Sequence, residues 1–369
     1  MEKITKYAIV GCGSVSRNRY FGNVATIREA GGQLVAVCDQ VEERASLRGI
    51  EFGVPYFTDF DRMLAEVGFD LLVNLTYEKA HFSLNHKALL AGRHVYTQKP
   101  MTTTVAEATT LIEEAKKRNL KIVSEEVRPI ILIMRIIKKL IDAGVIGKVT
   151  WARATCTHWG PAIIDNWPTD ARPKYEKGAG PLRDPGVERL HALTYLLGPV
   201  KRVTAMSGIN QPEVVVRGGP GQDMHIQVEE DDITLLLLDF GNSVFAMLDT
   251  AWVNTRATLT PPLEIYGQKG VITHVGGPSR EPGQRDFDLR LYRDEPEFGI
   301  RGWTQVDAIP PLKQEPGIGI AGLLHAIDCI QGDKKPVASA EHARHCIEIV
   351  EKAYIAARNG IRQDIETTF

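Results

Sequence analysis

Near its N-terminus the chain reads Ala8-Ile9-Val10-Gly11-Cys12-Gly13-Ser14-Val15-Ser16. The apolar residues predict a short buried strand, and the glycines after it predict a tight turn into a helix. A second apolar run, Leu34-Val35-Ala36-Val37-Cys38, ends on Asp39. A strand, a glycine turn, a helix and a second strand closed by an acid form the βαβ pattern that binds dinucleotides.

The residue types of the turn suit a pyrophosphate. Gly11 permits the tight turn, and Gly13 lets the backbone approach the phosphates at the N-terminus of the helix. Ser16 stands where the pattern has a third glycine, and it is small enough for close packing of helix on strand. The predicted cofactor contacts of the turn are therefore Gly11, Gly13, Ser14, Val15 and Ser16.

Asp39 bears on which cofactor binds. Its carboxylate is placed to accept hydrogen bonds from the ribose hydroxyls, and it would repel a 2′-phosphate. The next residue is Gln40, and the first basic residue after it is Arg44. We therefore expect NAD as the cofactor in preference to NADP.

Bulk composition excludes several classes of protein. A chain of 369 residues that is 43% hydrophobic is long enough for two domains, and its net charge of −2 gives no basic footprint for nucleic acid or a membrane surface. The apolar stretch 129–141 contains three basic residues and predicts an amphipathic helix rather than a membrane span. The five cysteines lack metal-ligand spacing, and the first strand begins too early for a signal peptide. We expect a cytoplasmic protein that holds no metal.

The periodicity changes about one third of the way along the chain. Residues 1–125 alternate short apolar strands with helices, which predicts an α/β doubly wound parallel sheet, a Rossmann domain binding NAD(P). Residues 126–369 bring longer alternating strands and two late helices, which predicts an α+β domain for substrate binding and oligomerisation. Its sheet should be large, open and mostly antiparallel, with Pro/Gly-rich loops at 211–223 and 276–286. The exposed sheet face predicts a homodimer or homotetramer.

Several motifs, in order along the chain, resemble those of the Gfo/Idh/MocA family, to which glucose–fructose oxidoreductase and inositol dehydrogenase belong. They are the glycine turn, Asp39, residues 76–81, Gln98-Lys99-Pro100, residues 178–186 and Glu341-His342-Ala343-Arg344. The resemblance covers essentially the whole chain. It implies a Rossmann domain followed by a large open sheet domain, and NAD(P)-linked oxidation or reduction of hydroxyl carbons in sugars and cyclitols.

The resemblance assigns a catalytic role to Lys99. The family usually has Glu-Lys-Pro here, so Lys99 is kept and Gln98 departs from the pattern. Pro100 favours an extended backbone at Lys99, whose ammonium could hydrogen-bond the reacting hydroxyl and stabilise its alkoxide character. Loss of the acid at position 98 should favour the neutral, proton-accepting form of Lys99. The alternative is a surface lysine before a turn.

A second motif departs further from the family. After the turn at 178–180, Asp184 matches the acid of the family, but Glu188 stands where the family has a general-base histidine. On a helix beginning near Pro185, the side chains of Asp184, Glu188 and His191 would share one face. The base is then Glu188, its pKa raised by desolvation, or His191 oriented by Glu188. The structural alternatives are an N-cap for Asp184, an ion pair for Glu188 and a core position for His191.

The remaining candidates are weaker. The resemblance suggests cofactor contacts beyond the glycine turn from Thr76, Tyr77, His81, Gln98 and Lys99. Substrate contacts are expected from Lys99, Arg128, His158, Trp167, Arg183, Asp184 and Glu188. An Arg183 that reached the substrate would favour a carboxylate-bearing or phosphorylated sugar. His81 as a core residue, Arg128 as a helix-entry ion pair and Trp167 as a core aromatic are the structural alternatives.

Three functions fit these residues. The first is a dehydrogenase that moves a hydride between NAD and a secondary hydroxyl of a sugar, cyclitol or sugar acid. The second is a glycoside hydrolase or lyase that retains NAD and oxidises the sugar transiently. Gln98 and Glu188, which depart from the family pattern, favour this alternative. The third is a nucleotide or sugar sensor without catalysis.

Overall fold

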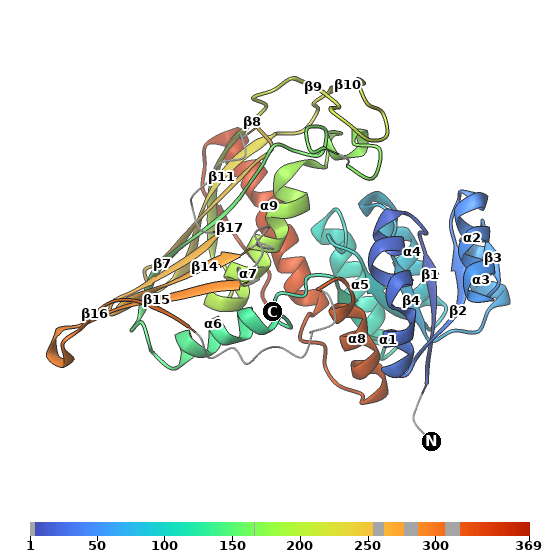
Figure 1. Cartoon of the computed structure of the whole chain (residues 1–369), viewed down its shortest axis with the longest axis horizontal. Helices are drawn as coiled ribbons and strands as arrows, with labels where there is room; N and C mark the ends of the chain where they lie inside the picture. The colour runs from blue at the N-terminus through green and yellow to red at the C-terminus, as the bar shows by residue number, and fades with distance from the viewer. Residues whose placement is uncertain (1–3, 166, 254–261, 277–286, 307–317) are drawn as a thin grey trace. The chain divides into compact units, whose positions relative to one another are not determined.

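The computed structural model describes residues 4–165, 167–253, 262–276, 287–306 and 318–369. Within it the chain forms two compact units (Figure 1). The first unit comprises Met1–Ile131, Lys313–Ile347 and Thr367–Phe369, and the second comprises Leu132–Leu312 and Glu348–Glu366. We describe each unit by itself.

A six-stranded sheet forms the centre of the first unit. Its strands are β1 (Thr5–Val10), β2 (Gly32–Cys38), β3 (Tyr56–Phe57), β4 (Leu71–Asn74), β5 (His94–Thr97) and β6 (Ile122–Ser124). They lie in the order β3-β2-β1-β4-β5-β6, and every neighbouring pair is parallel. The predicted doubly wound parallel sheet is confirmed. The strand order reverses between β1 and β4, and sheets of this type bind ligands at the carboxyl ends of the strands beside such a reversal.

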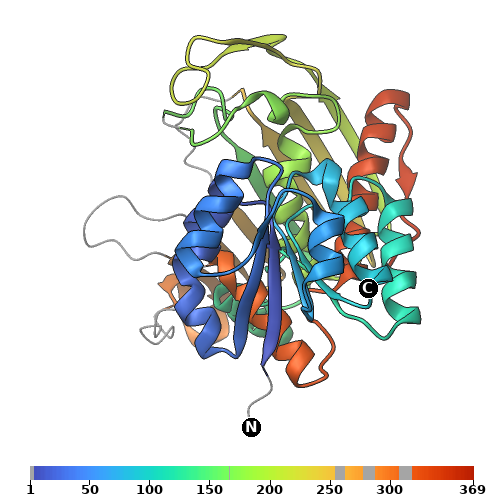
Figure 2. The same ribbon diagram turned by 90° about the vertical axis from the view of Figure 1, so that its right-hand side faces the viewer.

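Helices cover both faces of this sheet (Figure 2). They are α1 (Val24–Glu29), α2 (Glu42–Phe52), α3 (Phe60–Glu66), α4 (Glu78–Leu90), α5 (Val105–Lys117) and α8 (Ile318–Gln331). Two of them begin with side-chain caps: Asp59 accepts a hydrogen bond from the backbone N–H of Arg62, and Thr104 forms a capping box with Glu107. The segment after the glycine turn is π-helix η1 (Ser16–Tyr20) and 3-10 helix η2 (Phe21–Asn23) before α1. The single long helix expected there is thus divided.

Alternate residues of each strand feed two separate cores. Tyr7 and Ile9 of β1 lie in one apolar cluster, and Ala8 lies in the other. The first cluster also contains Leu323 and Ile327 of α8, so this late helix covers one face of the first sheet. Helix α8 therefore belongs to the first unit, although it follows the second sheet along the chain.

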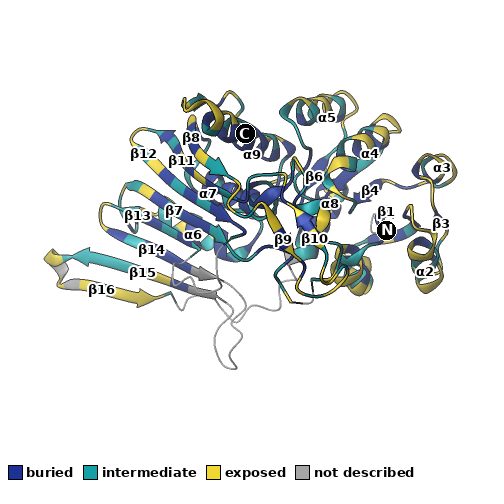
Figure 3. Ribbon diagram, turned by 90° about the horizontal axis from the view of Figure 1, so that it is seen from above, coloured by how far each residue is buried: buried dark blue, intermediate teal, exposed yellow. Residues whose placement is uncertain are grey.

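The second unit contains a nine-stranded sheet. Its strands are β7 (Val149–Thr157), β8 (Arg202–Gly208), β11 (Ile233–Gly241), β12 (Val244–Ala251), β13 (Leu263–Gly267), β14 (Gly270–Gly276), β15 (Phe287–Glu295), β16 (Ile300–Gln305) and β17 (Gln363–Asp364). The order is β16-β15-β14-β13-β7-β12-β11-β8-β17. Among the described strands of this second sheet, only β7 and β12 pair in parallel, which confirms a mixed, largely antiparallel sheet. Buried and exposed positions alternate along β11 and β12 (Figure 3).

Helices pack on one face of this second sheet. Helix α7 (Val187–Leu197), which follows π-helix η4 (Leu182–Gly186), contacts β7, β12 and α6 (Leu132–Asp142). Helix α9 (Ala340–Asn359) crosses the boundary of the units, and short 3-10 turns lie at η3 (Arg172–Lys174) and η5 (Pro296–Phe298). The apolar stretch 129–141 contributes to α6, the amphipathic helix expected there.

One loop prediction needs correction. The segment 211–223 is not a plain loop, because β9 (Glu213–Val215) lies in it and pairs with β10 (His225–Gln227). Short strands framed by glycine and proline give too little periodicity to be predicted. Of the second predicted loop, all but residue 276 falls outside the described residues. Among the helices that the structure describes, none has the length and apolar character to cross a membrane.

Candidate active site

The glycine turn has the geometry that its sequence predicts. Gly11 has φ +91°, and a Cβ there would lie 2.8 Å from the carbonyl carbon and oxygen of Leu75. A Cβ on Gly13 would meet nothing within 4 Å, so open space lies over the turn. Ser16 is fully buried, and its hydroxyl donates to the carbonyl of Gly13 at 2.9 Å. The turn is therefore closed on its strand side and open above Gly13, as a phosphate cradle requires.

Asp39 lies directly after β2 and is tied to the same turn. Its Oδ2 accepts the backbone N–H of Cys12 at 2.7 Å, and its Oδ1 accepts that of Val41 at 2.8 Å. Each carboxylate oxygen can accept a further hydrogen bond. The side chain is thus fixed at the strand end with capacity left for ribose hydroxyls.

Polar side chains link the ends of β4 and β5. The backbone N–H and hydroxyl of Thr76 both donate to Asn74 Oδ1, at 3.2 and 2.6 Å. Asn74 donates in turn to Asn85 at 2.9 Å, and Asn85 donates to the hydroxyl of Thr97 at 3.0 Å. Tyr77, the N-cap residue of α4, is 53% exposed. The network fixes the backbone beside the point where the strand order reverses, with Tyr77 open to solvent.

His81 joins the loops that follow these two strands. Its Nδ1 lies 2.8 Å from the carbonyl oxygen of Pro100, and its Nε2 lies 3.0 Å from that of Thr76. Burial lowers the pKa of His81, and the two backbone hydrogen bonds act in the opposite direction. The buried ring is placed to hold the backbone around Lys99.

Gln98 belongs to a buried network that sequence reasoning missed. Its Nε2 donates to the hydroxyl of Tyr20 at 2.8 Å, which lies 2.8 Å from the hydroxyl of Tyr96. The Tyr96 hydroxyl donates in turn to Glu125. Because Glu125 already places an acid in this network, a glutamate at position 98 would add a second buried negative charge. A neutral amide avoids that repulsion, which gives a physical reason for Gln98.

Lys99 and Arg128 are both half-buried at this edge of the sheet. The peptide bond between Lys99 and Pro100 is cis. Sequence reasoning also passed over Glu126, a 3% exposed acid two residues after the end of β6. Its position at the end of the strand next to β5 is the signal that could have identified it.

In the second unit, Asp184 has a basic partner. Its Oδ2 lies 3.1 Å from Nζ of Lys174, with 21% of the lysine side chain and 25% of the aspartate side chain exposed. The N-cap residues of η4 and α7 are Pro181 and Gly186, so the N-cap alternative for Asp184 is wrong. Helical geometry begins at Leu182, earlier than the helix expected near Pro185. Nothing in the sequence spacing pointed to Lys174.

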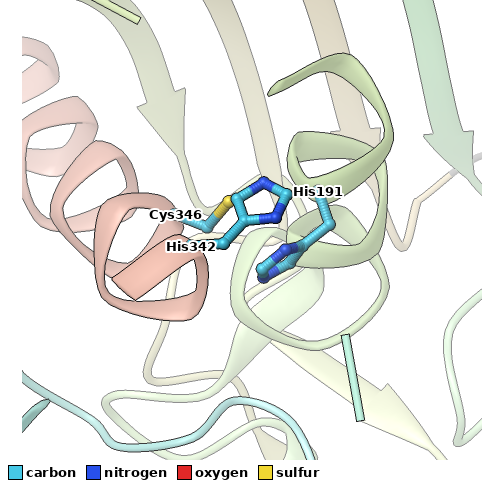
Figure 4. Close-up of side chains that lie close together, drawn as sticks. All are labelled: His191, His342 and Cys346. Carbon is cyan, nitrogen blue, oxygen red and sulfur yellow. The ribbon is translucent and has the colours of Figure 1, made fainter. Parts of the chain in front are cut away.

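Glu188 and His191 lie three residues apart on α7 and share a face of it. Glu188 is half-buried, whereas His191, drawn in Figure 4 on its helix, has no exposed surface. Arg189, one of the ion-pair partners expected for Glu188, donates from Nε to the carbonyl of Thr155 at 3.2 Å. Of these two base candidates, Glu188 is therefore the more accessible.

His158 lies among hydrogen-bond donors. The backbone N–H of Gly160 points at its Nδ1 at 2.9 Å, and the indole N–H of Trp252 points at its Nε2 at 3.1 Å. A neutral imidazole accepts at only one nitrogen, so the two bonds cannot form together. Burial lowers the pKa of His158, against an opposing effect of Asp184. Both observations favour an uncharged ring.

Two other predicted substrate contacts pack against aromatic neighbours. The guanidinium carbon of Arg183 lies 5.4 Å from the ring centroid of Tyr354. Trp167 packs against an apolar cluster that contains Tyr175 and Trp252. Each contact holds its side chain in place within the second unit.

Comparison with known proteins gives the family. Residues 5–126 match the model of the oxidoreductase family with an NAD-binding Rossmann fold. Residues 134–273 match the GFO/IDH/MocA C-terminal domain. The chain belongs to the GFO/IDH/MocA family. It is an oxidoreductase with an NAD-binding domain, as its sequence predicts.

Several relatives within this family carry names. A D-apiose dehydrogenase from Paraburkholderia graminis is 25% identical over 368 residues, which cover 96% of this chain and 88% of that protein. A D-glucoside 3-dehydrogenase from Escherichia coli is 29% identical over 209 residues, 55% of this chain and 57% of that protein. The structure of a levoglucosan dehydrogenase with NADH and L-sorbose aligns with a TM-score of 0.81 at 19% identity, over 98% of this chain and 99% of that one. At that identity the structural match supports the fold.

Proposed function

We propose that the protein is an NAD-dependent dehydrogenase that oxidises a secondary hydroxyl of a sugar, cyclitol or sugar acid. The observation that carries the proposal is the position of Lys99. It follows β5 at the same sheet edge as the glycine turn and Asp39, close to the reversal of strand order. The names of the relatives, D-apiose dehydrogenase and D-glucoside 3-dehydrogenase, support the substrate class.

Lys99 would act on the reacting hydroxyl. When bound, NAD supplies a nicotinamide ring that accepts a hydride from the hydroxyl carbon. The Lys99 ammonium would donate a hydrogen bond to the hydroxyl oxygen and stabilise the negative charge that develops as its proton leaves. Gln98, Thr76, Tyr77 and His81 are proposed to shape the cofactor site beside it, with Gln98 and His81 acting through the hydrogen bonds that hold the loops.

Residues of the second unit would orient the substrate and take the proton. Asp184 is proposed to hold the substrate hydroxyl, with Lys174 orienting its carboxylate. Glu188 is the favoured proton acceptor because its side chain is partly accessible, and the buried His191 would act behind it. Arg128, His158, Trp167 and Arg183 remain proposed substrate contacts.

The proposed quaternary structure is a homodimer or homotetramer formed through the second sheet. Strand register places large apolar side chains on the face opposite α7, and we call this set the outer face: Trp151, Met206, Leu235, Leu237, Phe245 and Trp303. Each is at least 40% exposed. A monomer rarely presents such a patch to water, and a second copy of the sheet would cover it. The free cysteines fit the proposed cytoplasmic location.

The direct test is turnover. The purified protein would be incubated with NAD, and separately with NADP, against a panel of polyols, sugars and sugar acids while absorbance of reduced cofactor is followed. We expect NADH to form with one substrate class, and the reduction of NADP with the same substrates to be slower. Bound NAD without NADH release across the panel would contradict it and favour the NAD-retaining hydrolase or lyase.

A further inference from the structure

Glu126 is a buried acid beside Lys99 that the proposed function does not use. Strands β5 and β6 run parallel with Thr97 opposite Ser124, and the backbone N–H of Glu125 donates to the carbonyl of Thr97 at 2.9 Å. Lys99 follows the end of β5 by two residues, and Glu126 follows the end of β6 by two residues. The two side chains therefore start from adjacent strand ends.

The backbone that follows Lys99 is held by His81 and lies close to this acid. The backbone N–H groups of Glu126 itself and of Met101 lower the pKa of the Glu126 carboxyl, against the larger effect of burial. His81, on α4, lies with Nδ1 2.8 Å from the carbonyl oxygen of Pro100. Glu126 thus lies close to the segment that carries Lys99, and the charge of Lys99 acts on its carboxyl.

Charged groups from two elements act on Glu126. They are Lys99, after β5, and His81, on α4, and both favour the carboxylate. Burial has the larger effect and raises the pKa of Glu126 to about 7. The adjacent acid, Glu125, accepts instead from Tyr96 in the tyrosine network. Glu126 is therefore the acid whose charge changes beside Lys99 near neutral pH.

We propose that Glu126 is a positioning residue that pairs with Lys99, orients its amine and keeps it charged. The inference rests on the proposed role of Lys99. When Glu126 is ionised, its negative charge stabilises Lys99 as the ammonium that donates to the reacting hydroxyl. When Glu126 is protonated, this stabilisation of the ammonium is lost. Gln98, next to Lys99, carries no negative charge. Glu126, which follows the adjacent strand β6, supplies that charge instead.

The pH profile of Glu126→Gln tests this role. In the wild type, kcat/KM should rise through pH 7 as Glu126 ionises. In Glu126→Gln this rise should disappear. The value of kcat/KM should also fall about tenfold or more, because one charge-assisted contact is lost. The KM for NAD should stay unchanged. The matched control Glu125→Gln should keep the rise. A Glu126→Gln enzyme that keeps the rise at the same midpoint would overturn the proposal.

The conservative variant Glu126→Asp distinguishes a role of the Glu126 charge from a purely structural role of the side chain. It keeps an acid but withdraws it by one methylene, so a pH-dependent rise should return with a shifted midpoint. If Glu126→Gln does not fold, this shift carries the test. An unshifted midpoint in Glu126→Asp would count against a direct pairing.

A second measurement does not depend on turnover. The rate of Lys99 acylation by an amine-reactive anhydride would be followed by mass spectrometry across pH, with the exposed Lys116 as internal control. Glu126→Gln should move the Lys99 midpoint to lower pH and leave Lys116 unchanged. A shifted midpoint without turnover of any sugar would contradict the proposed function alone. Turnover with an unchanged midpoint and pH profile would contradict the Glu126 inference alone.

Discussion

Asp39 has two roles that the sequence showed only in part. Its place after the second strand predicts ribose binding, and the structure adds that its oxygens hold the backbone at Cys12 and Val41. A substitution there therefore affects both the cofactor and the turn. This coupling depends on contacts 27 residues apart in the chain, which spacing alone does not reveal.

Replacing Asp39 by Asn should weaken NAD binding and relax the preference for NAD over NADP. Loss of a charged acceptor costs about 1.5–3 kcal/mol, or roughly 10- to 100-fold in Kd for NADH. Fluorescence titration of both reduced cofactors would measure it. Asp59→Asn, at the N-cap of α3, should lower stability slightly and leave both Kd values unchanged. An unchanged Kd in Asp39→Asn would remove Asp39 from the cofactor site.

Glu126 should make stability depend on pH in a defined direction. Its pKa is about 7 in the folded protein against an ordinary value of 4.5, so between these values the folded state binds more protons. Stability contributed by Glu126 therefore falls as pH rises from 4.5 to 7, and it is level above that range. The lowered pKa of His81 gives a slope of the opposite sign, so variants must be compared at each pH.

The measurement is urea unfolding of the wild type and Glu126→Gln at several pH values. Between pH 4.5 and 7 the variant should gain about 1–3 kcal/mol relative to the wild type, because one pKa unit corresponds to about 1.4 kcal/mol. Parallel pH curves for the two proteins would show that Glu126 titrates normally in the folded state.

Residue identities could be predicted where a motif fixes a role. Gly11, Gly13 and Asp39 stand where the βαβ pattern requires them, and the structure gives them suitable surroundings. Partners such as Lys174 for Asp184 arise from chain segments that only the fold brings together. The roles of Asp184, Glu188 and His191 in catalysis remain predictions.

At the scale of elements, the glycine turn allows stability and cofactor binding to be separated. Gly11→Ala adds a Cβ at positive φ against the backbone of Leu75, so the protein should be strongly destabilised. Gly13→Ala adds a Cβ in open space and should leave the melting temperature nearly unchanged while weakening NAD binding at least tenfold. Melting curves with and without NAD measure both. Equal NAD affinity in Gly13→Ala and wild type would contradict a pyrophosphate at this turn.

Elements were predictable in proportion to their length and periodicity. The long helices α8 and α9 follow from apolar patterning, as do the strands of the first sheet other than the two-residue β3. The division of the first helix into η1, η2 and α1 does not, because local hydrogen-bond geometry decides it. Strand β16, five residues after β15, also went unpredicted, since a glycine interrupts its sequence.

At the scale of the whole molecule, the order of elements along the chain does not show which sheet a late helix covers. An apolar stripe on α8 shows that this helix is buried, but it does not show on which sheet. The helix packs on the first sheet after the chain has built most of the second. Packing between segments so far apart in the chain is seen only in the three-dimensional structure.

The proposed assembly can be broken at the outer face. Leu237→Glu, on β11 and 58% exposed, places a charge within the apolar patch and should convert the oligomer to monomers. Light scattering after size exclusion would give the mass. Ile50→Glu, at a 77% exposed position on α2, is the control and should leave the mass unchanged. A wild-type monomer, or an oligomer unaffected by Leu237→Glu, would exclude this face as the interface.

The most direct test of the account is the fate of the substrate hydrogen. A sugar substrate carrying deuterium at the reacting carbon would be incubated with NAD and the wild-type protein, and both products would be analysed by mass spectrometry. The account predicts deuterated NADH and a ketone product in equal amounts. In Lys99→Met the rate at which both products form should fall at least 100-fold. Deuterium that remains in the sugar product while NAD stays oxidised and bound would contradict it.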